Sequence, residues 1–85
     1  MSEISRFFGI SVRMYHNEHG PPHFHALYGE YSVSIRCADG SLRGRIPPRA
    51  ARLLREWYDL HRQELLDNWS RAVLGLDLQP IEPLE

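Results

Sequence analysis

Three histidines lie within seven residues of one another, and their spacing is suited to binding a metal ion. His19, His23 and His25 form the pattern H-x3-H-x-H. In a strand, His23 and His25 point to the same side with Cα atoms about 7 Å apart, so that both imidazoles can reach one ion. His19, or His16 in the same loop, would supply a third ligand. The pattern is therefore compatible with a divalent metal ion on His19, His23 and His25, whereas the alternatives below need no cofactor.

The same histidines are also suited to proton transfer. Imidazole gains and loses a proton near neutral pH, so His23 and His25, assisted by His19, could cleave RNA without a metal ion. In that reaction the 2′-hydroxyl attacks the adjacent phosphate, and arginine stabilises the developing charge. The arginine candidates for this role are Arg13, Arg36 and Arg45. In a third interpretation the histidines are structural, and their imidazoles hydrogen-bond to the backbone of a rigid loop. The three interpretations leave open whether the protein is an enzyme.

Alternating polar and apolar residues in the first half of the chain predict strands. The expected strands are residues 4–16 (bent at Gly9), 23–28, 31–37 and 41–46. Gly29-Glu30 and Asp39-Gly40 are typical of two-residue hairpin turns. Such turns pair Tyr28 with Tyr31, pair Cys37 with Leu42, and place Arg36 opposite Arg43. Both registers gather the apolar residues on one face, which a slip of one residue would prevent.

Apolar residues at helical spacing over residues 48–74 predict one long helix. Pro48 suits the first helical position and Gly75 the position just past the end. The residues expected to pack on the apolar sheet face are Leu54, Trp57, His61 and Leu65. The predicted fold is α+β: a four-stranded, mainly antiparallel β-meander with one long C-terminal helix on one face. Residues 1–75 form this single domain, and residues 76–85 an extended tail.

The expected helix is longer than the sheet that it covers. It spans roughly 40 Å, whereas strands of six or seven residues span roughly 20–23 Å. Three arrangements would account for the part of the helix that extends beyond the sheet. The first strand covers it, the helix breaks near His61, or a second chain buries Leu66, Trp69 and Val73. A homodimer is therefore one of the hypotheses.

The other sheet face is expected to be basic. Its predicted members are Ser11, Arg13, Tyr15, His23, His25, Leu27, Ser32, Ser34, Arg36, Arg43 and Arg45, with no acidic residue among them. Antiparallel sheets commonly leave one face in solvent, and flexible arginines are compatible with that role. The alternative is a surface that binds an anion, either a phosphate backbone or an acidic partner.

The composition narrows the class of protein. The chain has 85 residues, a net charge of −1 and one cysteine, so no internal disulfide can form. No apolar run approaches the ~20 residues that cross a bilayer, and the start of the chain lacks the features of a signal peptide. A cytoplasmic protein without a membrane partner is expected. The charge is unevenly divided, because the first half is slightly basic and the helical half is acidic.

Several motifs together are similar to a known family. They are the stretches at residues 4–10, 13–15, 17–19, 21–26 and 28–31, with the helical segments 56–57, 60–62 and 64–69. The chain resembles the small bacterial family called domain of unknown function 4160. The resemblance implies no established activity. It does imply a small protein partner encoded alongside, because members often occur in pairs that are similar to toxin–antitoxin units.

The expected role is therefore a regulatory or interaction module in such a two-protein unit, with RNA or DNA as a further partner. The predicted binding residues are Arg6, Arg13, Tyr15, Arg36, Arg43 and Arg45, beside the loop that carries His19, His23 and His25. The resemblance favours the residues that lie in its motifs, which are Arg6, Arg13, Tyr15, His19, His23 and His25. Arg43 and Arg45 stand where fewer arginines are expected of the family.

Overall fold

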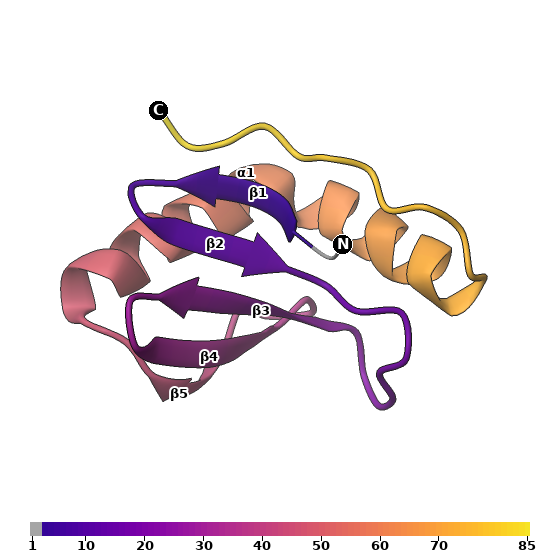
Figure 1. Cartoon of the computed structure of the whole chain (residues 1–85), viewed down its shortest axis with the longest axis horizontal. Helices are drawn as coiled ribbons and strands as arrows, with labels where there is room; N and C mark the ends of the chain where they lie inside the picture. The colour runs from indigo at the N-terminus through magenta and orange to yellow at the C-terminus, as the bar shows by residue number, and fades with distance from the viewer. Residues whose placement is uncertain (1–2) are drawn as a thin grey trace.

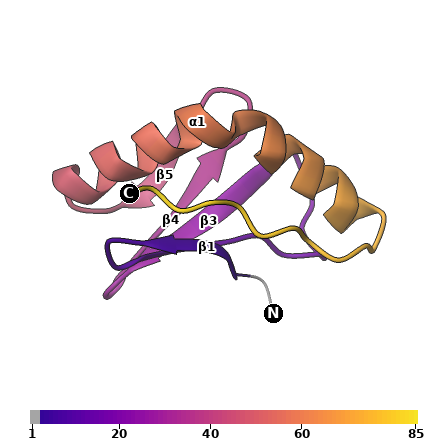
Figure 2. The same cartoon turned by 90° about the horizontal axis from the view of Figure 1, so that it is seen from above.

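The computed structural model describes residues 3–85, which form a sheet covered on one face by a helix. The strands are β1 (Glu3–Phe7), β2 (Ile10–Arg13), β3 (His23–Tyr28), β4 (Tyr31–Arg36) and β5 (Leu42–Arg45), and the helix is α1 (Pro48–Val73). Neighbouring strands are antiparallel and follow chain order, β1-β2-β3-β4-β5 (Figure 1). Seen from above, α1 lies along one side of the sheet (Figure 2). The α+β meander with one C-terminal helix is confirmed.

The sheet has five strands rather than the predicted four, because residues 4–16 fold into a hairpin. Phe8 and Gly9 form its turn with φ of 49° and 82°. Positive φ at both central residues is the signature of a type I′ turn, whose twist matches that of the strands it joins. Phe7 then pairs with Ile10. The single bent strand predicted here was wrong.

The hairpin between β3 and β4 has the predicted register, with Tyr28 opposite Tyr31. The next hairpin does not, because Leu42 pairs with Ile35 and not with Cys37. The loop contains four residues instead of two, and the Arg36 N–H donates to the Ser41 carbonyl at 3.0 Å.

Contacts with α1 explain the longer loop. The Tyr58 hydroxyl donates to the Cys37 carbonyl at 2.6 Å, and Arg62 donates to the Ala38 carbonyl. The register therefore shifts by two residues, which leaves each side chain on its predicted face. Arg43 faces Ser34 rather than Arg36, so the predicted like-charge pair does not form.

The helix packs on the apolar sheet face as predicted, through the buried residues Leu54, Trp57 and Leu65. It bends at His61, whose φ of −125° and ψ of 22° are not helical. This bend is one of the three solutions expected for the excess length of the helix. No helix among residues 3–85 is long and apolar enough to span a bilayer.

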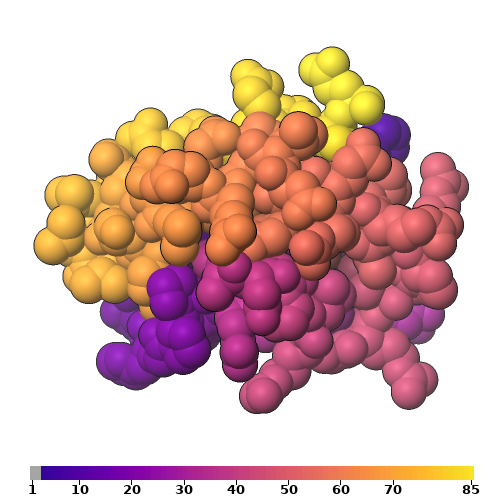
Figure 3. Space-filling model, turned by 180° about the vertical axis from the view of Figure 1, so that it is seen from behind, coloured from indigo at the N-terminus to yellow at the C-terminus, as the bar shows by residue number. Residues whose placement is uncertain are grey.

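The last ten residues form neither helix nor strand, yet they pack back on the domain (Figure 2). The Ile81 N–H donates to the Ile4 carbonyl at 2.8 Å, and Trp57 Nε1 donates to the Glu82 carbonyl at 2.8 Å. Ile81 and Leu84 are buried. The tail therefore runs between the β1 edge and the helix, and with α1 it covers most of the face seen in Figure 3.

Candidate functional site

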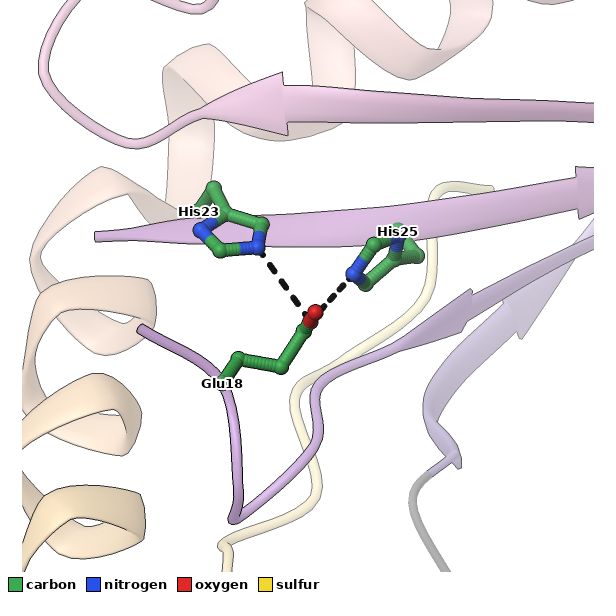
Figure 4. A group of neighbouring side chains, drawn as sticks. All are labelled: Glu18, His23 and His25. Carbon is green, nitrogen blue, oxygen red and sulfur yellow. Dashed lines mark hydrogen bonds and ion pairs between the residues drawn. The ribbon is translucent and has the colours of Figure 1, made fainter. Parts of the chain in front are cut away.

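Two of the predicted histidines converge on a carboxylate. His23 and His25 stand two residues apart on β3, and their Nε2 atoms both approach Oε1 of Glu18, which comes from the preceding loop (Figure 4). The His23 contact is 3.2 Å, and the His25 contact is a hydrogen bond. The three ligand atoms lie within 4.8 Å of one another. We call Glu18, His23 and His25 the histidine–carboxylate cluster.

Neighbouring groups fix the orientation of both imidazoles. His23 Nδ1 donates to the Pro21 carbonyl at 2.9 Å. The rings of Trp69 and Tyr15 lie 5.2 Å from those of His23 and His25, respectively. Tyr15 thus contacts the cluster through His25, and Trp69 joins from the far half of α1.

His19 is not a member of the cluster. It lines a neighbouring pocket of about 350 Å³, whose other lining residues are Pro21, His23, Ser34, Arg36, Ser41, Leu42 and Arg43. The pocket lies between the loop before β3 and the β4–β5 hairpin. None of its lining residues is acidic, so among the described residues it is a basic, hydrogen-bonding concavity. His23 belongs to both the cluster and the pocket.

The outer face of the sheet, opposite α1, is less purely basic than predicted. Glu3 accepts hydrogen bonds from Arg6 and Ser11, and Arg13 in turn donates to the Ser11 hydroxyl at 3.1 Å. The hydrogen bond from Ser11, with Arg6 beside it, lowers the pKa of Glu3 below its ordinary value. With Glu18, this places two carboxylates where the sequence predicted none. Arg6 is consequently neutralised by an ion pair of 2.9 Å.

The strand registers align the other predicted residues into one row across four strands. Arg13 pairs with His25, His25 with Ser34, and Ser34 with Arg43. Three strand spacings make this row about 14 Å long. Arg36 lies beside the row, opposite His23, and Arg45 lies opposite Ser32. Within residues 3–85, no ion pair is formed by Arg36, Arg43 or Arg45.

A family model named domain of unknown function DUF4160 matches residues 9–70, which is most of the chain. The chain belongs to the DUF4160 family. No curated protein and no solved structure matches it. The cluster, the pocket and the row all lie inside the part that matches DUF4160, whereas Glu3, Arg6 and the C-terminal tail lie outside it.

The geometry bears on each chemical interpretation of the DUF4160 histidines. Two-histidine cleavage of RNA needs each imidazole to lie within hydrogen-bond reach of the proton that it transfers. Here both Nε2 atoms of His23 and His25 point at one oxygen of Glu18. A metal ion, by contrast, needs ligand atoms that converge on one point. The residue that sequence reasoning missed is Glu18, although it lies in the Asn17-Glu18-His19 motif.

Proposed function

We propose that this protein is an interaction module whose outer sheet face binds the phosphate backbone of a nucleic acid. The observation that carries the proposal is the basic pocket, which Arg36 and Arg43 both line and in which neither forms an ion pair with a described residue. Arginine presents a planar fork of donors that matches phosphate oxygens. The hydroxyls of Ser34 and Ser41 and the imidazoles of His19 and His23 add further hydrogen-bond donors to this pocket.

The charge distribution also favours phosphate binding on the outer face of the sheet. Apart from the paired Arg6 and Glu3, the outer face and its adjoining loops carry Arg13, Arg36, Arg43 and Arg45 against Glu18 and against Asp39, whose pKa is lowered by hydrogen bonds from Ser41 and also by the Arg36 charge. The helical half and tail carry an excess of acidic residues. A polyanion is therefore attracted to the sheet side and repelled from the other layer. The net charge of −1 conceals this asymmetry.

The test is binding of a fluorescein-labelled, mixed-sequence 12-nucleotide RNA, followed by anisotropy at several salt concentrations. We expect a Kd in the range of about 10⁻⁴–10⁻⁶ M at physiological salt, as is usual for backbone recognition. Arg36→Gln and Arg43→Gln should each weaken binding and reduce the salt slope by about 0.7, the value of one contact to a single strand. Arg52→Gln, on the exposed side of α1, is the matched control with the same loss of charge.

An unchanged salt slope in Arg36→Gln and Arg43→Gln, or an equal loss in Arg52→Gln, would overturn the proposal. Single-stranded DNA and duplex RNA in the same assay establish which polymer is preferred. Cleavage of the RNA in the presence of EDTA, abolished by His19→Ala and His23→Ala, would instead support the ribonuclease alternative. That alternative is favoured only by the pocket, which both imidazoles line.

The proposal places this binding in the bacterial cytoplasm, within the two-protein unit that the family likeness implies. The second protein would act as the regulatory partner of the module. Purification of the untagged chain from its native host, with identification of bound protein and nucleic acid, tests this arrangement. Recovery of the chain free of both, or only as a homodimer, would contradict it.

A further inference from the structure

The histidine–carboxylate cluster contains an unfavourable contact unless a cation is present. The Pro21 carbonyl can only accept, so its 2.9 Å hydrogen bond places the proton of a neutral His23 ring on Nδ1. The Nε2 atom of that ring then carries a lone pair and faces Oε1 of Glu18 at 3.2 Å. Two acceptors at this distance repel each other. Either a second proton on the ring or a metal ion between the two atoms relieves the repulsion.

The surroundings match those of an imidazole that binds metal. Ligating histidines usually donate their other ring nitrogen to a carbonyl or carboxylate, which fixes the tautomer, and the His23–Pro21 hydrogen bond has this form. Figure 4 shows the side chain of Glu18 rising from the loop toward both imidazoles. From these observations we propose that Glu18, His23 and His25 bind one divalent transition-metal ion of the zinc class.

The backbone holds the three ligands in place. His25 lies on an inner strand, paired to Arg13 on one side and to Ser34 on the other. The loop that carries Glu18 is tied to the sheet where the Cys37 N–H donates to the Pro22 carbonyl at 3.0 Å. A paired strand and an anchored loop hold the backbone of the ligands, so binding an ion requires mainly that the side chains move apart around it, which favours affinity.

The ligand set indicates both the metal and the character of the site. Two imidazoles and one carboxylate suit Zn²⁺ and its neighbours in the first transition row, rather than Mg²⁺ or Ca²⁺. Three protein ligands leave a fourth position free, as in sites that bind an exchangeable ligand. The side chains of Glu18, His23 and His25 are 30%, 19% and 24% exposed, so solvent reaches this position.

The arginines nearby influence what occupies the free position. A divalent ion with one carboxylate leaves one net positive charge, and Arg13 and Arg36 flank the histidines in the sheet register. This field opposes a bare cation and favours one that carries an anionic ligand such as hydroxide or phosphate. The site can be tested separately from nucleic-acid binding through Glu18 and His25, because neither of these ligands lines the basic pocket, whereas His23 belongs to both the cluster and the pocket.

The experiment is a titration of the tag-free, metal-stripped chain with Co²⁺, followed by visible absorption, and then displacement by Zn²⁺. We expect one equivalent of Co²⁺ to produce the intense bands of a four-coordinate site. Outer-shell partners alone are worth about 10- to 100-fold in metal affinity, so Glu18→Gln and His25→Gln should each weaken binding by more than about 100-fold. His16→Gln is the control, because this imidazole lies in the same loop but bonds to the Leu76 carbonyl.

Thermal unfolding gives a second measurement that does not depend on the variants. Zn²⁺ at a free concentration of 100 times its Kd should raise the Tm of the natural chain by about 10 °C or more. Circular dichroism of each variant confirms that it is folded. Absence of the Co²⁺ bands and of the Zn²⁺ shift would overturn the proposal and leave a plain imidazolium–carboxylate pair. Equal metal affinity in Glu18→Gln and in the natural chain would overturn it as well.

Discussion

Replacing Asn68 with alanine is expected to detach the C-terminal tail from α1. The Asn68 side chain is almost fully buried, at 1% exposure, and its amide makes two hydrogen bonds to the backbone of Gln79. Nδ2 donates to the Gln79 carbonyl at 2.9 Å, and the Gln79 N–H donates to Oδ1 at 2.8 Å. These bonds lie where the chain turns back along the helix, before Ile81 reaches the β1 edge.

The magnitude follows from the bonds and from the burial that they maintain. Each hydrogen bond contributes about 1 kcal/mol, and a buried backbone group left unpaired costs about 1–3 kcal/mol. We therefore expect Asn68→Ala to lower the free energy of unfolding by about 2–3 kcal/mol. Release of Ile81 and Leu84 would add to this loss, since burying such a side chain is worth about 1.5–3 kcal/mol. For a domain of this size the expected fall in Tm is roughly 10–20 °C.

Urea and thermal unfolding, followed by circular dichroism, measure this loss. Gln63→Ala is the control on the same helix, because its exposed side chain bonds only to Asp67, and it should change stability by less than about 0.5 kcal/mol. A chain that ends at Leu78 lacks the Gln79 partner, so Asn68→Ala should cost much less there. An equal cost in the shortened and full chains would refute the reasoning, because it would show that Asn68 acts without the tail.

Three further predictions concern the loop between β4 and β5. Tyr58→Phe leaves the Cys37 carbonyl without its buried donor and should cost about 1–3 kcal/mol in urea unfolding; no change would show that water replaces the hydroxyl. Gly40→Ala would place a Cβ 2.7 Å from a Tyr58 ring carbon at a φ of +74°, so a Tm loss equivalent to more than about 1 kcal/mol is expected. Burial raises the pKa of the Cys37 thiol from 9.0 to about 11, so the folded state holds this proton more tightly than the unfolded state. The resulting contribution to stability is complete below pH 9 and is lost as pH rises through 11. The free energy of unfolding should therefore decrease less between pH 8 and pH 10.5 in Cys37→Ala than in the natural chain.

Local sequence patterns predicted most of the fold because the sheet is a meander of neighbouring strands. Gly29-Glu30 determined the register between β3 and β4, since a turn and the apolar alternation agreed. The β1–β2 turn was missed because Phe8 is not a residue that favours positive φ, and because polar–apolar alternation continues through it. The β4–β5 loop was misjudged because Tyr58 and Arg62 hold its carbonyls from α1, a contact that local turn chemistry does not reveal.

The candidate site was predictable only where its residues lie on a strand. His23 and His25 share a face because side chains alternate along β3. Glu18 and His19 lie in a loop without periodicity, so their directions depend on how that loop returns to the sheet. The bond from Cys37 to the Pro22 carbonyl anchors the return, and it brings Glu18 to the imidazoles while His19 lines the pocket.

The two glutamates of the outer face have different consequences for the two proposals. Glu3 neutralises Arg6 at one edge of the sheet, so under the nucleic-acid proposal a phosphate backbone binds toward the other edge, at Arg36 and Arg43. Glu18 pairs with imidazoles rather than with an arginine, so it leaves those arginines unpaired. Glu18→Gln should therefore weaken metal binding by more than about 100-fold, while RNA affinity stays equal or rises because a negative charge beside the pocket is removed. Arg36→Gln should weaken RNA binding and leave metal binding in place. Failure of one proposal can therefore be recognised without failure of the other.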